Sequence, residues 1–242
     1  MESIRLATRS SKLALWQANE VSARLKEKGI ACEIIPVRSS GDIDLVNPIY
    51  EMGVTGVFTR ELDIALLNKD ADIAVHSLKD VPVITAKGTT IAAVLPRADV
   101  HDMLIHKGRL PGKEKFVVAT SSIRRRSQWM ERFPNHETVN IRGNVETRIQ
   151  KLKESDFDGL IMAKAAIDRL DMKLPNTLSL DWMLPAPAQG AIGIACRHND
   201  KHVLGKLEKI NHHQTFTAVS AEREFLHELK GGCSAPISAH VV

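Results

Sequence analysis

The chain has 242 residues, of which 43% are hydrophobic and 26% are charged, and its formal net charge is +4. This composition is typical of a globular protein of about one or two domains, and the longest apolar runs, such as residues 91–95, are too short to span a membrane. Three cysteines without a secretory signal indicate a cytoplasmic protein, and the scarcity of aromatic residues argues against a base-stacking nucleic-acid surface.

Short apolar runs alternate with helical patterns over the first 95 residues. The patterns predict strands over residues 4–7, 33–37, 73–75 and 91–95, and helices over residues 11–25 and 58–67. Ser11 is a suitable N-cap for the first helix, whose apolar positions recur every three or four residues. This alternation predicts a mostly parallel sheet covered by helices.

A second unit of the same kind follows Pro96. The polar stretch 97–102 indicates a crossover to this unit. Its predicted strands cover residues 116–119, 139–141 and 160–162, and its helices begin at Ser122 and at Asn144.

A second crossover is indicated by Pro185 and Pro187. After it the sequence predicts a strand over residues 191–196 and helices over 202–210 and 217–229, with Gly231 as a left-handed cap. Two crossovers imply an α/β protein whose two lobes enclose a cleft. Lobe 1 would comprise residues 1–96 and 190–211, and lobe 2 residues 97–189.

Arginines recur where predicted strands give way to helices, at Arg9, Arg124, Arg125 and Arg142. Ligands of open α/β sheets gather at the carboxyl ends of strands, and helix N-termini there favour anions. Because arginine pairs with carboxylates through two hydrogen bonds, we expect a ligand that carries several carboxylates or phosphates. The alternative is that arginines form solvated helix faces, and we prefer it for Arg126 and Arg132.

Asp80 and Cys233 are the other candidates for chemistry. Asp80 follows a predicted strand, where a carboxylate among cations can hold a cationic intermediate or transfer a proton, or can simply order the turn before Pro82. Two glycines precede Cys233 and leave room for a large group on its sulfur, although a buried, inert cysteine is the commoner case. Cys32 and Cys196 lie in apolar runs and are expected in the core. The ten histidines show no metal-ligand spacing, so no metal is predicted.

Six segments together resemble the porphobilinogen deaminase (hydroxymethylbilane synthase) family. They are ATRSS (7–11), DIAVHSLKDVP (72–82), TSSIRR (120–125), RGNVETR (142–148), LPAPAQGA (184–191) and GGC (231–233). Any one could occur by chance, but six in this order over nearly the whole chain are specific.

The resemblance implies a transferase that deaminates four porphobilinogen molecules and joins them head to tail into hydroxymethylbilane, in haem biosynthesis. It also implies a covalent dipyrromethane cofactor on Cys233 and two lobes like those of periplasmic binding proteins. Asp80 matches the catalytic aspartate of the family. The matching cofactor and substrate contacts are Arg9, Ser11, Lys79, Ser122, Arg124, Arg125, Arg142, Arg148, Arg169 and Gln189.

The sequence departs from the family pattern in three places. Glu51 and Thr55 stand where lysines are usual, and Ala166 stands where glycine is common. Residues 212–242 match only the start of a third, α+β domain, which bears the cofactor cysteine. A non-catalytic binder of a small polyanion is therefore the alternative function, and nucleic-acid binding a third one. We expect a cytoplasmic monomer with porphobilinogen as its small-molecule partner, and neither nucleic acid nor membrane.

Overall fold

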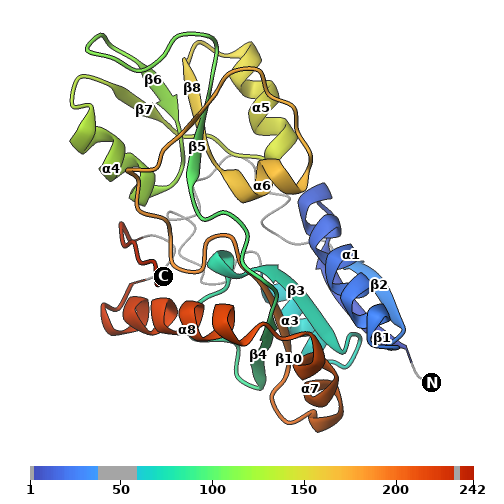
Figure 1. Ribbon diagram of the computed structural model, residues 1–242. Coiled ribbons are helices and arrows are strands. Elements are labelled where there is room, and N and C mark those ends of the chain that lie inside the picture. Colours follow the sequence, from blue (N-terminus) through green and yellow to red (C-terminus); the bar gives the residue numbers. More distant parts are fainter. Residues whose placement is uncertain (1–2, 38–58, 232–234) are drawn as a thin grey trace.

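The computed structural model describes residues 3–37, 59–231 and 235–242, which form two five-stranded sheets joined by two crossovers (Figure 1). The first sheet has the strand order β2-β1-β3-β10-β4. Its strands are β1 (Ile4–Arg9), β2 (Cys32–Val37), β3 (Ile73–Ser77), β4 (Thr89–Val94) and β10 (Ile192–Arg197). The second sheet has the order β7-β6-β8-β5-β9. Its strands are β5 (Asp102–His106), β6 (Val117–Ala119), β7 (Glu137–Val139), β8 (Gly159–Ala163) and β9 (Thr177–Ser179).

Both sheets have one antiparallel strand in the fourth place of the order. β10 pairs antiparallel with β3 and β4, whereas β1 is parallel to β2 and β3. In the second sheet β5 pairs antiparallel with β8 and β9, whereas β6 is parallel to β7 and β8. β5 and β10 are the strands that directly follow the two crossovers. The prediction of two α/β lobes with mixed, mostly parallel sheets is therefore confirmed.

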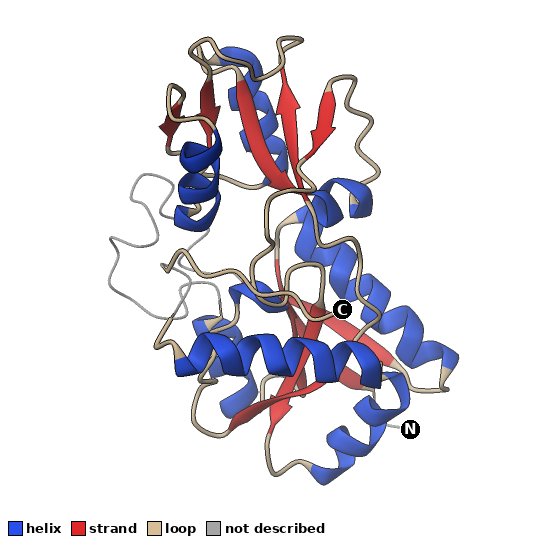
Figure 2. Ribbon diagram, turned by 60° about the vertical axis from the view of Figure 1, so that its left-hand side comes forward, coloured by secondary structure: helices blue, strands red, loops and turns tan. Residues whose placement is uncertain are grey.

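Helices cover both sheets, and Figure 2 shows one sheet toward each end of the molecule. The helices on the first sheet are α1 (Lys12–Glu27), α3 (Arg60–Leu67) and α7 (Lys201–Leu207), and α8 (His213–Glu228) packs against β4. The helices on the second sheet are α4 (Ile123–Arg132), α5 (Val145–Glu154) and α6 (Lys164–Arg169). Short 3₁₀ turns cover Leu78–Asp80 and Glu208–Ile210.

Three elements were missed by the sequence patterns: β5, β9 and α6. The polar stretch 97–102 does contain the first crossover, but Asp102 already begins β5. The predicted strand over 139–141 was also misplaced, because β7 ends at Val139. Beyond β7, the chain bonds to Ser121, whose Oγ donates to Ile141 O at 2.6 Å and accepts from Ile141 N at 2.9 Å.

Side-chain caps begin the main helices next to the strand ends. Ser11 Oγ accepts from Ala14 N at 3.3 Å, and Asn144 Oδ1 accepts from Thr147 N at 2.8 Å, as predicted for both residues. Ser122 caps α4 in the same way, accepting from Arg125 N at 3.4 Å. Each cap satisfies a backbone N–H that would otherwise lack a partner in the helix, and so fixes where the helix starts.

Separate apolar cores lie on the two sheets. The first includes Leu6, Leu25 and Ile194, together with Cys196, which is fully buried. Burial raises the pKa of the Cys196 thiol to about 11, so this cysteine is an inert core residue, as expected. Cys32 is only partly buried at the rim of the same core. The largest buried side chain of the second sheet is Trp129, which packs beside Phe116.

The segment after α8 differs from the prediction of a glycine cap. Lys230, and not Gly231, has the left-handed backbone conformation, with φ of 51°. A Cβ added to Gly231 would lie 2.4 Å from Ile237 Cδ1 and 2.6 Å from Leu226 Cδ1, so the glycine is required for close packing. The chain is thus held against the end of α8 two residues before Cys233, which lies outside the described residues.

Candidate active site

A recess of about 80 Å³ lies where β1 and β3 end. Three of the predicted site residues line it: Arg9, Ser11 and Asp80. Gln17 of α1, whose side chain is buried, also lines it and donates from Nε2 to Ser77 Oγ at 2.9 Å. The first sheet therefore brings a carboxylate and an arginine to the carboxyl ends of neighbouring parallel strands, as open α/β sheets do at their ligand sites.

His76 lies in the lining of the same recess and is 7% exposed. Burial and, second, the positive charge of Arg9 lower the pKa of His76 to about 4. Its imidazole is therefore neutral at pH 7, and the lining of the recess combines this neutral ring with a cation and a carboxylate. The sequence patterns gave His76 no role of its own.

In the second lobe, two predicted site arginines share one buried carboxylate. Arg124 Nη2 donates to Asp102 Oδ2, and Arg125 Nη2 donates to Asp102 Oδ1, both at 2.7 Å. Burial alone would raise the pKa of Asp102, but the charges of Arg125 and Arg124 outweigh it and hold the pKa well below its usual range. Asp102 therefore stays ionised, and the alternative of solvated arginine faces is wrong for Arg124 and Arg125.

Lys79 and Gln189 connect this arginine pair to the first lobe. Lys79 Nζ donates to Gln189 Oε1 at 3.2 Å, and Gln189 Nε2 donates to Asp102 Oδ1 at 3.0 Å. Burial and the charge of Arg125 lower the pKa of Lys79 to about 8, against the opposing effect of Asp80 and Asp102. Lys79 is thus mostly charged at pH 7 and loses that charge in a mildly alkaline medium.

Arg142 and Arg148 add two further cations to the second lobe, close to each other and to Arg125. Arg142 is 6% exposed, and Arg148 donates from Nε to Gly143 O at 2.8 Å. Burial, followed by the charges of Arg125 and Arg142, lowers the pKa of Arg148 to about 10, while Asp80 opposes the change. Asp80 of the first lobe and Arg148 of the second therefore lie within electrostatic reach of each other.

Arg169 occupies a different position, at the contact between α6 and α1. Its Nη2 donates to Gly190 O at 2.7 Å in the second crossover, and its guanidinium lies 5.7 Å from the ring centroid of Trp16. Burial lowers the pKa of Arg169 to about 10, against the charge of Glu20. Arg169 thus joins the lobes beside the site, where it contacts the protein's own backbone and Trp16.

The sequence patterns also missed a link between the two crossovers and α8. Arg97 donates from Nη1 and Nη2 to Glu222 Oε1 and Oε2 at 2.6 and 2.9 Å, and from Nε to Gln189 O at 2.9 Å. Glu222 is fully buried and also accepts from Ala188 N at 2.7 Å and Val241 N at 2.9 Å. Glu222 therefore ties both crossovers and the C-terminal residues to one helix.

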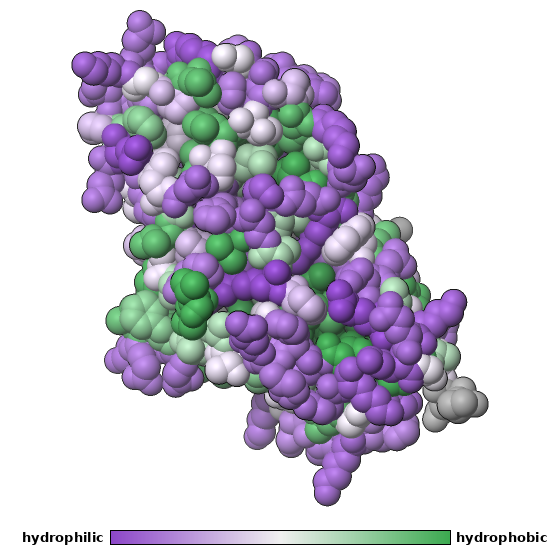
Figure 3. Space-filling view, in the orientation of Figure 1, coloured by the Kyte–Doolittle hydropathy of each residue, from purple (hydrophilic) through white to green (hydrophobic). Residues whose placement is uncertain are grey.

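The structure thus gathers most of the predicted residues between the lobes, where the face seen in Figure 3 has hydrophilic patches interspersed with hydrophobic ones. Cys233, Glu51 and Thr55 lie outside the described residues, so their predicted roles stay predictions. Asp102 was missed because its partners are more than 20 residues away in the chain. Its one local signal is an acidic residue at the start of an apolar run directly after a crossover.

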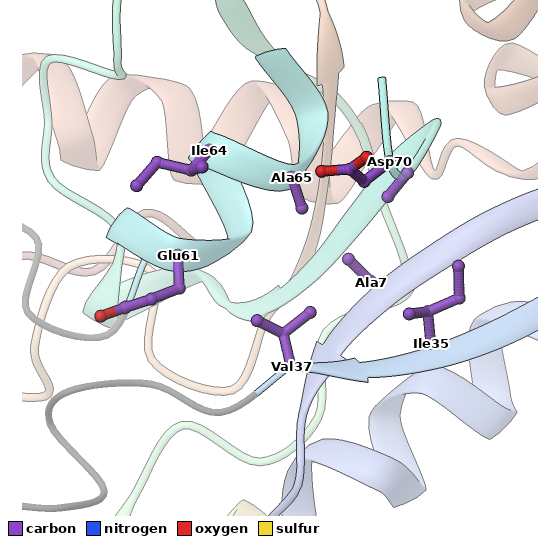
Figure 4. A pocket seen from close by; sticks show the side chains of 8 residues that line it. Ala7, Ile35, Val37, Glu61, Ile64, Ala65 and Asp70 are labelled. Carbon is purple, nitrogen blue, oxygen red and sulfur yellow. The ribbon is translucent and has the colours of Figure 1, made fainter. Parts of the chain in front are cut away.

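A larger hollow, of about 330 Å³, lies between α3 and strands β1 and β2 (Figure 4). Its lining is mostly apolar, with Ile35, Val37 and Ile64, and with Glu61 and Asp70 at its edge. None of the predicted site residues that the structure describes lines this hollow. The polar recess around Asp80 is therefore the better candidate for the site, although it is smaller.

No helix among the described residues is both long and apolar enough to cross a membrane. Among solved structures, the chain resembles a double mutant of the VFT2 domain of BvgS from Bordetella pertussis, with a TM-score of 0.51 and 12% identity over 94% of this chain and 92% of that one. It also resembles an ancestral cationic amino acid solute binding protein, with a TM-score of 0.50 and 14% identity over 93% and 90%. These neighbours support a two-lobed, periplasmic-binding-protein-like fold and nothing more.

Sequence comparisons are more specific. Residues 4–205 match the family model described as porphobilinogen deaminase, dipyromethane cofactor binding domain, and residues 216–242 match the model of its C-terminal domain. The chain is 45% identical to the chloroplastic porphobilinogen deaminase of Oryza sativa subsp. japonica, over 98% of this chain and 69% of that protein. It is 42% identical to the porphobilinogen deaminase of Syntrophomonas wolfei, over 99% and 80%. The chain belongs to the porphobilinogen deaminase family.

Proposed function

We propose that this chain is a transferase that deaminates four porphobilinogen molecules and condenses them head to tail into hydroxymethylbilane during tetrapyrrole synthesis. The observation that carries the proposal is the meeting of Asp80 with Lys79 and with Arg148 of the second lobe, two cations that Arg125 also influences. An acid faces several fixed cations there, which suits a substrate with a leaving amine and carboxylate side chains.

Asp80 is proposed as the catalytic residue. When the carbon–nitrogen bond of the substrate's aminomethyl group breaks, ammonia leaves with the bonding electrons and the pyrrole is left as a delocalised cation. A carboxylate fixed beside that cation stabilises the transition state, because the charge it opposes develops only as the bond breaks. The same carboxylate can accept hydrogen bonds from the pyrrole N–H, which becomes more acidic in the cation.

The arginines and Lys79 are proposed to bind the acetate and propionate groups. Arg9 and Ser11 would act from the first lobe, and Ser122, Arg124, Arg125, Arg142 and Arg148 from the second. Hydrogen bonds to the protein hold Arg124, Arg125 and Arg148 in place before any ligand arrives, so little ordering of these side chains is needed on binding. Gln189 holds Lys79, and Arg169 holds the second crossover against α1.

A dipyrromethane cofactor on Cys233 would supply the primer to which the substrate units are added. The residues fit such a polycarboxylate group, since Arg124 has a buried Nε that donates no hydrogen bond to any described residue, while its neighbours form a cluster with excess positive charge. Arg124, Arg125 and Lys79 would hold its carboxylates. Gly231, packed against α8, would fix the direction in which the attachment segment leaves the helix.

We further propose a monomer that acts in the cytoplasm on this small-molecule substrate, without nucleic acid or membrane. We propose that one lobe comprises residues 1–96 and 190–211, that the other comprises residues 97–189, and that residues 212–242 belong to a third domain. The division of the strands between two separate sheets supports the two lobes. The match to the family model of the C-terminal domain supports the third domain.

The proposal is tested by intact-mass measurement together with turnover of porphobilinogen. We expect a mass increase equal to two linked pyrroles, its loss in a Cys233→Ser variant, and release of ammonia as porphobilinogen is consumed. A bare chain that consumes no porphobilinogen would contradict the proposal. Binding of porphobilinogen without release of ammonia would favour the polyanion-binding alternative instead.

A further inference from the structure

Asp102, the first residue of β5, is a carboxylate with no exposed side-chain area and several donors around it. Its Oδ2 accepts from Arg124 Nη2, and its Oδ1 accepts from Arg125 Nη2 at 2.7 Å and from Arg125 Nε at 3.1 Å. Gln189 Nε2 donates to the same Oδ1 at 3.0 Å. A buried arginine without a counter-charge is strongly unfavourable, so one carboxylate allows two guanidinium groups to stay buried side by side.

The remaining contacts of the two arginines fix their orientation. Arg124 Nη1 donates to Leu184 O at 2.6 Å, in the second crossover, and Arg125 Nη1 donates to Ile161 O at 3.1 Å, in β8. All three nitrogens of Arg125 therefore donate to the protein itself. Arg125 can act on a ligand through the charge of a fixed group, and it cannot turn freely to follow one.

We infer that Asp102 is a positioning residue of this site, which fixes the guanidinium groups of Arg124 and Arg125 and orients Gln189 to accept the hydrogen bond of Lys79. The consequence for catalysis rests on the proposed function, in which these three cations bind carboxylates. Three cations and one carboxylate leave this cluster a formal charge of +2. Asp102 thus sets both the geometry of the cluster and how much positive charge it presents.

Lys79 reports on this arrangement, because its ammonium group lies within the cluster. The groups around Lys79 are Arg125 and Arg124, which lower its pKa after burial does, Asp80 and Asp102, which raise it, and the neutral Gln189. Removing the charge of Asp102 leaves the cations unopposed on that side. Lys79 should then lose its proton at lower pH and be largely neutral at pH 7.5.

The test is an NMR titration of the Lys79 ammonium group in the full chain, assigned with a Lys79→Arg variant. In Asp102→Asn we expect the pKa of Lys79 to fall by about one pH unit or more. A nearby carboxylate favours the charged ammonium, so loss of this carboxylate lowers the pKa. The matched control is Asp99→Asn, since Asp99 lies three residues before Asp102, in the first crossover, but pairs with Lys164 at 3.1 Å and with His101. The control should leave the Lys79 titration unchanged.

Two further variants keep the inference open to refutation. Asp102→Glu retains the charge and should restore a Lys79 pKa near that of the parent chain. If Asp102→Asn does not fold, the same change is made in an Arg125→Gln background, where one buried cation fewer is left unopposed, and the pKa of Lys79 should still fall relative to Arg125→Gln alone. An unchanged Lys79 titration on removal of Asp102 in a folded variant would overturn the inference.

Turnover separates this inference from the proposed function. The titration needs no substrate, so a chain that shows the Lys79 shift but consumes no porphobilinogen refutes the function and supports the positioning role. Where the parent chain is active, Asp102→Asn should move the alkaline limb of its kcat/KM profile to lower pH by the same interval, and Asp102→Glu should return it. A limb that stays in place, in an active variant, contradicts the positioning role.

Discussion

The two lobes share one strand arrangement but carry opposite chemistry where their strands end. Among the described residues that line its recess, the first lobe presents one carboxylate, Asp80, together with Arg9 and a neutral His76. The second presents a cluster of arginines, of which Arg124 and Arg125 are fixed by one buried carboxylate. Similar backbones therefore serve different steps: in the proposed reaction the first lobe stabilises a developing cation and the second holds carboxylates. Function on this scaffold is set by side chains at the sheet edges.

The largest effect should come from removing the acid of the first lobe. Asp80→Asn keeps the shape but removes the negative charge, so turnover of porphobilinogen should fall about 100-fold to 1,000-fold, because a fixed group that opposes transition-state charge contributes that much. Intact-mass measurement should still find the dipyrromethane adduct, and the fraction of chains that carry it should fall much less than the turnover rate does. Asp70→Asn, an exposed change in the same lobe, should leave both unchanged. Equal rates in Asp80→Asn and the parent chain would remove Asp80 from the mechanism.

Breaking the arginine cluster of the second lobe should affect stability as well as binding. Arg124→Leu leaves Asp102 partly uncompensated, so the free energy of unfolding should fall by about 3 kcal/mol, and both cofactor loading and substrate use should weaken. Denaturant unfolding and intact-mass measurement check the two effects. Arg126→Leu, in the same helix but bonded to Asn140, is the matched control and should change neither by a comparable amount. Unaffected loading and kinetics in Arg124→Leu would reduce Arg124 to a charge without a role in the site.

Acid should weaken the first lobe through His76. Its pKa is about 4 in the folded chain and about 6.5 in the unfolded one, so between these values the unfolded chain binds the extra proton. Stability is therefore lost as pH falls from 6.5 towards 4, by up to about 3 kcal/mol from this residue. Unfolding free energies at pH 7 and pH 4.5 should differ more in the parent chain than in His76→Gln. The same difference in both proteins would show that His76 is not held neutral.

The two serine caps offer the smallest and most symmetrical comparison. Ser11 begins α1 in the first lobe and Ser122 begins α4 in the second, and each accepts one backbone N–H. Replacing either by alanine should lower the unfolding free energy by about 1 kcal/mol, whereas Asn144→Ala measures the same loss at a cap outside the predicted site. Beyond that shared loss, only the serine variants should raise the KM for porphobilinogen. Equal KM values in all three would restrict the serines to capping.

Much of the fold follows from local patterns, and the parts that do not are set by distant contacts. The periodicity of α1 and the caps at Ser11 and Asn144 are local, so the sequence predicts them well. β5 was missed because Asp102 has a charged side chain, and only its buried ion pair with residues of α4 explains a carboxylate at the start of a central strand.

The site shows the same division. Asp80 and the arginines at strand ends could be named from position and family resemblance, because these depend on neighbours in the chain. The pairing of Glu222 with Arg97, 125 residues apart, could not be predicted this way, nor could the requirement for Gly231 to pack beneath Ile237. Such contacts depend on how the helices and crossovers come together, which no short segment specifies.

The place of β10 in the first sheet has a consequence for how the chain is made. β10 lies between β3 and β4, so among the described strands β4 pairs with β10 alone, and it must await residues 192–197. Every strand of the second sheet, in contrast, falls within residues 102–179. On the ribosome, the middle of the chain can therefore complete its sheet before the beginning of the chain can. Although domains generally fold from the N-terminus during synthesis, this topology reverses that order and leaves the edge of β4 unprotected for longer.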